Sequence, residues 1–302
     1  MTEVLVVGSL MMDLITYAPA LPKTGETVFG TSFQTSFGGK GANQAVQAAR
    51  LGCKTAMIGC VGADSYGTEY LAQLSKEGVD VSNIIASSTS GTGIASIQVN
   101  AEGQNTIIIV QGANLQLQLS HVTAAESLIE SSNVVLCQNE ISFETTKETL
   151  TLCRKHKTVS VLNPAPASSR MLELLPLCDI FSPNETELAS LTGMPADTDA
   201  NITAAAEKLL TLGCKIVVVT LGERGAFISR AGESRFFPVV HRVEAVDTVG
   251  AGDSFLGSLA ANLARGATLD DAVPRAIYCA AQSVTKKGAQ GSCPTLQDLQ
   301  QL

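Results

Sequence analysis

The chain of 302 residues contains no hydrophobic run of the roughly 18 residues that a membrane-spanning helix needs, and no basic, apolar leader precedes its first strand-like segment. It also contains no repeat, charge block or low-complexity linker. Its eight cysteines form no C-x-x-C pair and lie mostly in apolar runs, which disfavours zinc and redox sites and is typical of buried thiols in a reducing compartment. We therefore expect a globular, cytoplasmic protein. Import into an organelle through a signal of another kind stays open as the alternative.

Positive charge is scarce. Twenty Lys and Arg residues stand against 28 Asp and Glu residues, which gives a formal net charge of -8. A negative net charge disfavours nucleic acid and anionic membranes as partners and favours a small molecule. If that molecule is a polyanion, the site must supply helix N-termini, backbone N–H groups or metal cations to hold it.

Two common nucleotide-binding motifs are also absent. The sequence has no G-x-x-x-x-G-K-[ST], which excludes a P-loop protein. After the first strand-like run the sequence is GSLMMD and not G-x-G-x-x-G, which disfavours a dinucleotide-dependent enzyme.

Short apolar runs rich in β-branched residues recur along the chain, with amphipathic stretches between them. Such runs are typical of parallel strands buried on both faces, and several of the intervening stretches end in glycine, which is favoured just after a helix. The alternation predicts a doubly wound, mostly parallel α/β sheet flanked by helices. The expected strands lie at 4–8, 55–62, 133–138, 159–163, 179–184 and 215–222.

Two stretches, 14–36 and 92–110, depart from this pattern because they alternate in polarity and carry the turn sequences PKTGE and NAEGQ. They predict two hairpins that pair as a small sheet projecting from the core. Ligands in such folds bind beyond the carboxyl ends of the strands, so we expect a lid; a dimerisation sheet is the alternative, and the two roles can coexist. The expected lid comprises residues 11–36 and 92–110, and the expected core comprises residues 1–10, 37–91 and 111–302.

The segment VEAVDTVGAGDSFLGSLAANLARG, at 243–266, combines a strand-like run, a glycine-rich turn and an apolar-periodic helix. Gly250, Ala251 and Gly252 would place backbone N–H groups at the helix N-terminus, where an anion is favoured. Asp253 would follow in the first helical turn. Alone it would be interpreted as a helix cap. Beside a phosphate-binding turn, it is suited to take a proton from an attacking hydroxyl while the N–H groups stabilise the transferred phosphoryl group.

A second glycine-rich stretch, SFGGKGANQAVQAARLG at 36–52, also opens a helix. Gly39 and Gly41 let the chain pass close to a ligand, and Asn43 can donate to and accept from hydroxyls. The alternative is a flexible turn with a solvated Lys40. Two glycine-opened helices in one chain suggest two adjoining ligands, a phosphate donor and an acceptor.

Five segments in chain order, FGGKGANQA, NPAPA, SPNETE, TLGERG and VDTVGAGDSF, resemble the ribokinase-like (PfkB) carbohydrate kinase family, and the match runs through nearly the whole chain. The resemblance implies an α/β core, a β-sheet lid that also forms a homodimer contact, and phosphorylation of a sugar or nucleoside by ATP. The implied activity is that of an ATP:D-ribose 5-phosphotransferase with Mg²⁺ and an activating K⁺. A 2-deoxyribose, fructose or nucleoside acceptor stays open, as does a non-catalytic regulator that binds a sugar or nucleotide.

The family's motifs imply a role for each matching residue. Asp253 would be the base for the 5-hydroxyl of ribose, with the N–H groups of Gly250, Ala251 and Gly252 as the anion hole. Carboxylates suit a furanose because its vicinal hydroxyls can donate paired hydrogen bonds. Taken alone, Asp13 would be a strand-end turn residue and Glu140 a solvated loop carboxylate. The sugar would be held by Asp13, Gly39, Lys40, Asn43, Glu140 and Asp253.

The resemblance also implies a nucleotide site and a cation site. Asn184 and Glu187 match the element that organises the phosphates and Mg²⁺ through water, and they equally fit a helix N-cap with its capping-box glutamate. Backbone carbonyls would supply most of the K⁺ ligands, although Lys286 could place its ammonium there instead. The nucleotide residues would be Asn184, Glu187, Thr220, Gly222, Gly225 and Gly252. The cation residues would be Asp247, Val249, Ser283, Lys286, Gly288 and Ser292.

Two positions depart from the family pattern. Met11 stands where bacterial ribokinases carry an Asn near the sugar, which implies fewer hydrogen bonds to the sugar. Ile277 stands where an Asn or His commonly lies against the adenine or its ribose, which implies an apolar shelf for the base. Neither position touches phosphoryl transfer.

Overall fold

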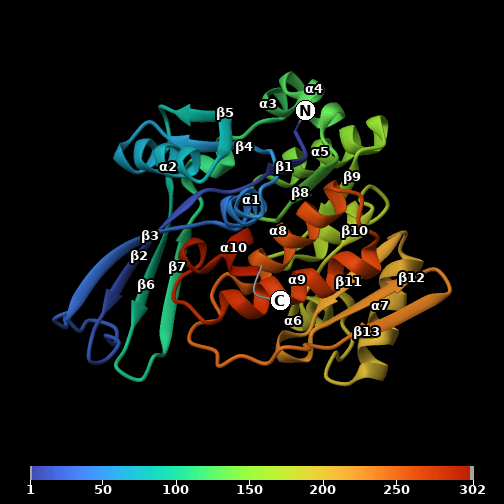
Figure 1. Ribbon diagram of the computed structural model, residues 1–302. Helices are drawn as coiled ribbons and strands as arrows, with labels where there is room; N and C mark the ends of the chain where they lie inside the picture. The colour runs from blue at the N-terminus through green and yellow to red at the C-terminus, as the bar shows by residue number, and fades with distance from the viewer. Residues whose placement is uncertain (1, 300–302) are drawn as a thin grey trace.

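The computed structural model describes residues 2–299, and in this range the strands form two separate sheets (Figure 1). In spatial order, the nine strands found there in the larger sheet are β13 (Glu233–Phe237), β12 (Ala226–Arg230), β11 (Ile216–Thr220), β10 (Ile180–Phe181), β9 (Val159–Leu162), β8 (Val134–Cys137), β1 (Val4–Val7), β4 (Thr55–Gly62) and β5 (Val79–Ser87). The strands from β11 to β5 are mutually parallel, and β12 and β13 are antiparallel at one edge. The predicted α/β sheet is confirmed.

The strand order reverses between β1 and β8, which pair in parallel at the middle of this sheet. From β1 the chain continues outward through β4 and β5, and after β8 it adds strands on the opposite side. Ligands of open parallel sheets bind beyond the carboxyl ends of the strands at such a reversal. The residues that follow Val7 and Cys137 are therefore the ones that the topology places at a binding site.

Helices cover both faces of the large sheet. Successive strand residues point to opposite faces, so each face has a hydrophobic cluster of its own. Val4 and Val6 pack into one hydrophobic cluster, and Leu5 and Val7 pack into the other. The first cluster is covered by α1 (Lys40–Arg50), α2 (Ser65–Lys76), α8 (Ala251–Ala264) and α9 (Leu269–Ser283). The second is covered by α3 (Leu119–Ala124), α4 (Glu126–Ser131), α5 (Phe143–His156), α6 (Glu185–Thr192) and α7 (Asp199–Thr211). The shorter helical segments are η1 (Gly112–Gln116), η2 (Ser169–Leu174), η3 (Gly222–Arg224), η4 (Gln290–Ser292) and α10 (Leu296–Leu299).

Helices α1 and α8 pack directly on each other, and Gly257 makes their close approach possible. A Cβ atom at Gly257 would lie 2.5 Å from the carbonyl oxygen of Gln44 and 2.6 Å from Cβ of Gln47. Only glycine leaves room for this contact. The packing brings residues of the two glycine-opened helices, which are some 210 positions apart in sequence, into hydrogen-bond contact.

The second sheet is small and stands away from the core, at the lower left in Figure 1. Its central strands are parallel partners, and each of them forms an antiparallel hairpin with its outer neighbour. The two predicted hairpins and their pairing are therefore confirmed. In spatial order the strands are β3 (Ser32–Gly38), β2 (Met11–Tyr17), β6 (Gly93–Val99) and β7 (Asn105–Val110).

Some elements differ from the sequence expectation. Strands β5 and β13 form the edges of the large sheet and carry exposed polar residues, so the pattern of apolar runs does not predict them. Strand β12 is mostly buried, but only residues 226–228 form an apolar run in it, which is too short to predict a strand. Conversely, the strand-like VEAV at 243–246 forms no strand. Two of its four side chains, Val243 and Ala245, instead line a cavity described below.

The cysteine pattern agrees with the sequence analysis. All eight thiols are free and buried, in line with their expected role as small apolar core residues. No helix within residues 2–299 combines the length and the apolar character that crossing a membrane would require.

Candidate active site

Side chains that follow β1 and β8 meet where the strand order reverses. Glu140 is buried there, and its carboxylate accepts hydrogen bonds from the Ser9 hydroxyl and, at 3.0 Å, from the backbone N–H of Lys40. The Ser9 oxygen in turn accepts from the N–H of Gly41 at 3.3 Å. Burial is the main cause that raises the pKa of Glu140. Glu140 is thus an anchored, buried carboxylate, and the alternative of a solvated loop residue is excluded.

Asp13 lies within β2, at the root of the small sheet, and not in a strand-end turn. A Cβ atom at Gly38, on the neighbouring strand, would lie 2.5 Å from both carboxylate oxygens of Asp13, so only glycine leaves space for them. Burial, and after it the charge of Glu140, raises the pKa of Asp13 to about 6. Two carboxylates that repel one another therefore share this region, and hydrogen-bond donors such as sugar hydroxyls would relieve that repulsion.

The start of α1 approaches the same region. Gly39 has a φ of 87°, and a Cβ atom there would lie 2.8–3.1 Å from the backbone at residues 9–11. The next side chain, Lys40, is partly buried among acidic groups. The charge of Asp253 is the largest cause that raises the pKa of Lys40, and Glu140 adds to it. Lys40 is therefore not a solvated turn residue, and it supplies the positive charge between the two glycine-opened helices.

Asp253 lies in the first turn of α8 and is only 7% exposed. Gly250 is the N-cap of this helix, and no side chain caps it, so the capping interpretation of Asp253 is excluded. Its Oδ2 accepts a hydrogen bond from Nδ2 of Asn43 at 2.9 Å, and its Oδ1 accepts one from Nε2 of Gln44 at 3.0 Å. The Oδ1 of Asn43 is buried with no protein partner and is therefore suited to accept from a hydroxyl group of a ligand.

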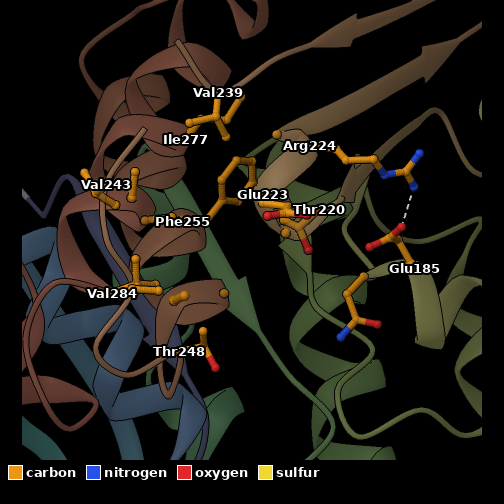
Figure 2. Close-up of a pocket in the computed structure, with 18 of the residues that line it drawn as sticks. Glu185, Thr220, Glu223, Arg224, Val239, Val243, Thr248, Phe255, Ile277 and Val284 are labelled. Atoms are coloured by element: carbon orange, nitrogen blue, oxygen red, sulfur yellow. Dashed lines mark hydrogen bonds and ion pairs between the residues drawn. The ribbon is translucent and has the colours of Figure 1, made fainter. Parts of the chain in front are cut away.

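A cavity of about 920 Å³ opens beside the N-terminus of α8, with Ala251 and Gly252 in its wall. Figure 2 shows apolar side chains along one side of it and polar ones along the other. The apolar side presents Val239, Val243, Phe255, Ile277 and Val284. The polar side includes Thr220 and Glu223, together with Arg224, which forms an ion pair with Glu185. A flat apolar group would match the apolar side, and the N-terminus of α8 is the part of the wall that favours an anion.

Five of the six predicted nucleotide residues line this cavity, and Glu187 is the exception: Asn184, Thr220, Gly222, Gly225 and Gly252. Asn184 and Glu187 form the capping box of α6, with reciprocal hydrogen bonds of 2.8 Å. This confirms the helix-start interpretation and leaves a ligand role open, because the bonds leave the second carboxylate oxygen of Glu187 and the NH₂ group of Asn184 unused. Burial raises the pKa of Glu187, which would favour a bound cation beside it.

Asp247 joins two loops and brings together three of the predicted cation residues, Asp247, Val249 and Gly288. Its Oδ1 accepts from the N–H of Val249 at 3.0 Å, and its Oδ2 accepts from the N–H of Gly288 at 2.9 Å. The ammonium of Lys286 lies 3.6 Å from the Asp298 carboxylate, which is its ion-pair partner. Residues 2–299 contain no cluster of three His, Cys, Asp or Glu side chains that could hold a metal ion. The oxygen-only donors here suit a hard monovalent cation.

The two departures from the family pattern lie at opposite parts of the site. Met11 is buried at the start of β2, two residues before Asp13. Ile277 is 7% exposed on α9, where it forms part of the apolar cavity wall, as the sequence analysis expects.

Several contacts at this site were not singled out from the sequence. Gln44, Ser9 and Gln138 bind the expected site residues or one another from distant segments. Gln44 directly follows Asn43 in the GANQA motif, which was the only available signal. Ser9 follows β1 and Gln138 follows β8. Their position at the site could be inferred only after the structure showed that these two strands are neighbours.

A model of the pfkB family carbohydrate kinases matches residues 1–296, and the chain belongs to this family. The predicted family is confirmed, and the protein is a sugar kinase. A ribokinase of Mus musculus is 43% identical over 301 residues, which cover 98% of this chain and 93% of that protein. A deoxyribokinase of Salmonella typhimurium is 38% identical over 296 residues, covering 98% and 96%. The solved structure of Arabidopsis thaliana ribokinase with ribose and ATP has a TM-score of 0.93 at 32% identity, covering 99% and 98%.

Proposed function

We propose that the protein transfers the γ-phosphoryl group of ATP to the 5-hydroxyl of D-ribose. One observation carries this proposal: the buried carboxylate of Asp253 stands at the boundary between two regions. Its neighbour Gly252 lines the cavity beside α8, and its own oxygens meet the side chains of Asn43 and Gln44 on α1. A proton acceptor in that position can serve an acceptor sugar and a donor nucleotide at once.

In the proposed reaction the 5-hydroxyl oxygen bonds to the γ-phosphorus while the bond from that phosphorus to ADP breaks. Asp253 takes the hydroxyl proton. The backbone N–H groups of Gly250, Ala251 and Gly252 stabilise the charge of the transferred group, at a helix N-terminus that already favours an anion. Asp13, Glu140 and the free Oδ1 of Asn43 accept hydrogen bonds from the sugar hydroxyls, and Gly39 and Lys40 complete that side of the site.

We assign Mg²⁺ to Asn184 and Glu187, which would hold it through water. The residues fit, because Glu187 is an acidic group whose pKa is raised by burial and whose second oxygen is left unused by the capping box. When bound, the ion neutralises charge on the ATP phosphates. The remaining nucleotide residues line the cavity.

We assign K⁺ to the loops joined by Asp247, with ligands from Val249, Ser283, Gly288 and Ser292 and the backbone of Lys286. The hydrogen bond from the N–H of Gly288 to Asp247 ties the C-terminal loop to the segment that leads into α8. A cation in these loops would therefore act on the shape of the anion hole and not on the transferred group directly.

A second acceptor, 2-deoxyribose, is the main alternative, since the Salmonella typhimurium relative is a deoxyribokinase. Met11 is buried close to Asp13, and an apolar side chain at this position lowers the number of hydrogen bonds available to a sugar. Fructose and nucleosides stay open as acceptors, as does a regulator that binds without turnover.

The experiment that tests the proposal is a coupled assay of ADP release with ribose, 2-deoxyribose, fructose and a nucleoside, each with KCl and with a potassium-free buffer. We expect ribose to give the largest kcat/KM, by about 100-fold or more over 2-deoxyribose, because a site that binds the 2-hydroxyl leaves its own polar groups unpaired when that hydroxyl is missing. KCl should raise the rate. A preference for another acceptor would refute ribose as the substrate, and nucleotide binding without any turnover would favour the regulator.

We propose that the small sheet is a lid over the sugar side and also the contact of a homodimer. Strand β7 supports the second role, because four consecutive apolar residues on it are about half exposed or more: Ile107, Ile108, Ile109 and Val110. An edge strand with such side chains is a ready site for pairing with another copy. A monomer by light scattering at micromolar concentration would contradict this assignment.

Lowering the pH is expected to weaken ribose binding, because it protonates Asp13. The raised pKa of Asp13, about 6, means that the free enzyme holds a proton there below that pH and is ionised above it. Only the carboxylate can accept two sugar hydroxyls, so the proton competes with ribose. The KM for ribose should stay flat from pH 8 to pH 7 and rise below about pH 6, by up to about tenfold per unit of pH.

The control is Asp13→Asn, measured over the same pH range. It should raise the KM for ribose at every pH and remove most of the rise on acidification. If the wild-type rise persists unchanged in this variant, another group causes it, and Glu140, whose pKa is also raised by burial, would be the first to examine.

A further inference from the structure

Gln44 is the most completely bonded side chain beside Asp253. It is fully buried, and its Nε2 donates to Oδ1 of Asp253 at 3.0 Å and to Oδ1 of Asn163 at 3.5 Å. Its Oε1 accepts from Nε2 of Gln138 at 2.7 Å. The Gln44 amide thus uses both of its N–H groups and its oxygen. Its three partners come from three different segments of the chain.

The carboxylate fixes the orientation of these amides. An ionised carboxylate only accepts hydrogen bonds, so Gln44 must turn its NH₂ group towards Asp253 and its oxygen towards Gln138. Gln138 must then present its own NH₂ group to Gln44. Its Oε1 is left buried without a partner, which is what the structure shows. Turning the Gln44 amide would point its oxygen at the carboxylate, and turning the Gln138 amide would point its oxygen at that of Gln44.

The surroundings hold the two other amides in place. Nδ2 of Asn163 donates to the carbonyl oxygen of Ser182 at 2.9 Å. A Cβ atom at Gly8 would lie 2.1 Å from Oε1 of Gln138, so the chain leaves space for this amide by having no side chain there. Asn163 begins the NPAPA motif and Ser182 begins SPNETE, and the proposed reaction gives neither of these two residues a role.

We propose that Gln44 is a positioning residue for phosphoryl transfer, which holds the Asp253 carboxylate in the orientation of a proton acceptor, and that Gln138 and Asn163 fix the Gln44 amide for this purpose. Asn43 binds the other oxygen of Asp253, so two consecutive amides of α1 define the plane of the carboxylate. Asn43 also has a free acceptor for the sugar, whereas Gln44 has none. Gln44 therefore acts on the base and not on substrate binding. This inference rests on the proposed function, in which Asp253 is the base.

Gln47 offers a matched control on the same helix. It is also a fully buried glutamine of α1 that bonds to α8, because its Oε1 accepts from the Ser254 hydroxyl at 2.8 Å. Its Nε2 donates to the carbonyl oxygen of Pro294 at 3.1 Å. It makes no hydrogen bond to Asp253. The variants Gln44→Leu and Gln47→Leu therefore remove the same buried amide from the same helix, and only the first one changes the contacts of the base.

The decisive readout is the pH profile of kcat, measured with the best acceptor from the substrate panel. For Gln44→Leu we expect kcat to fall about 10- to 100-fold, the KM for sugar and ATP to stay within about threefold, and the acid limb to move up by about one pH unit, because a donor to the ionised carboxylate is lost. Gln47→Leu should lower the melting temperature and leave the acid limb in place. The ionisable groups that face Asp253 are the same in both variants: Lys40, Tyr70, Glu140, Glu187 and Cys293.

A second variant keeps the test valid if Gln44→Leu does not fold. Gln138→Leu leaves Gln44 in place but frees its amide to turn, so kcat should fall by about 3- to 10-fold with an acid-limb shift in the same direction. Where both single variants fold, the double variant should be no slower than Gln44→Leu alone, because Gln138 acts only through Gln44. An unmoved acid limb in Gln44→Leu or Gln138→Leu would overturn the inference, and so would equal effects of Gln44→Leu and Gln47→Leu.

Failure of the proposed function has a different outcome. If Asp253 is not the base, Asp253→Asn keeps near-normal turnover. If Asp253→Asn is inactive while Gln44→Leu has the wild-type pH profile, the base assignment stands and the role of Gln44 is refuted.

Discussion

Replacing Asp253 with asparagine is expected to lower kcat for sugar phosphorylation by about 10²- to 10⁴-fold, the range that a general base contributes. The variant keeps the shape of the side chain but cannot take the hydroxyl proton. Affinity for ADP should change little, because the cavity wall includes Ala251 and Gly252 but not this side chain. Steady-state kinetics, together with calorimetric titration of ADP, would separate the two effects.

The amide that replaces the carboxylate also turns an N–H group towards Asn43 or Gln44, both of which donate to it in the native protein. Asp253→Ala therefore accompanies it, as a variant without that conflict. Asp271→Asn is the matched control, since Asp271 lies in the first turn of α9 and accepts from the Thr268 hydroxyl at the start of that helix. Ordinary kcat in both Asp253 variants would remove this residue from the mechanism.

The central part of the fold could be predicted from the sequence because its strands are buried on both faces. The expected strands 4–8 and 215–222 contain the continuously apolar stretches 4–7 and 216–219, which a buried parallel strand explains. Strands β5 and β13 could not be predicted for the opposite reason, since edge strands expose one side and carry polar residues. The pattern of a half-exposed edge strand resembles that of a loop.

The site could be predicted only as far as local motifs extend. GAGD and GGKGAN each indicate a helix that begins at glycines, and the structure places Asp253 from one beside Asn43 from the other. The amides that hold Gln44 could not be inferred, because their contacts join residues 94 and 119 positions apart and depend on the order of the strands. A buried glutamine in a helix has no local signal that separates a structural role from a positioning role. Gln44 and Gln47, three residues apart, illustrate this.

Filling the space at Gly252 is expected to abolish tight nucleotide binding without loss of stability. A Cβ atom at Gly252 would meet no heavy atom within 4 Å, and this residue lines the cavity at the N-terminus of α8. In Gly252→Leu the side chain would occupy the space through which a phosphate must approach the backbone N–H groups. The KM for ATP should rise because the phosphates lose their approach to these N–H groups. The kcat should fall by about 100-fold or more, in line with the loss of donors to a developing charge. Gly252→Ala should have an intermediate effect.

Because leucine is a better helix former than glycine, α8 itself should not be weakened, and the melting temperature should stay within a few degrees of wild type. Gly250→Ala, two residues earlier, should give the opposite result. Gly250 has a φ of 78°, and a Cβ atom there would lie 2.8 Å from Cα of Ala289, so the variant should lose stability through backbone strain and overpacking. Calorimetric titration with ADP and thermal melts of the three variants distinguish these effects. Unchanged nucleotide affinity in Gly252→Leu would show that the phosphates bind elsewhere in the cavity, and the anion hole would then have to be sought on its polar wall near Thr220 and Gly222.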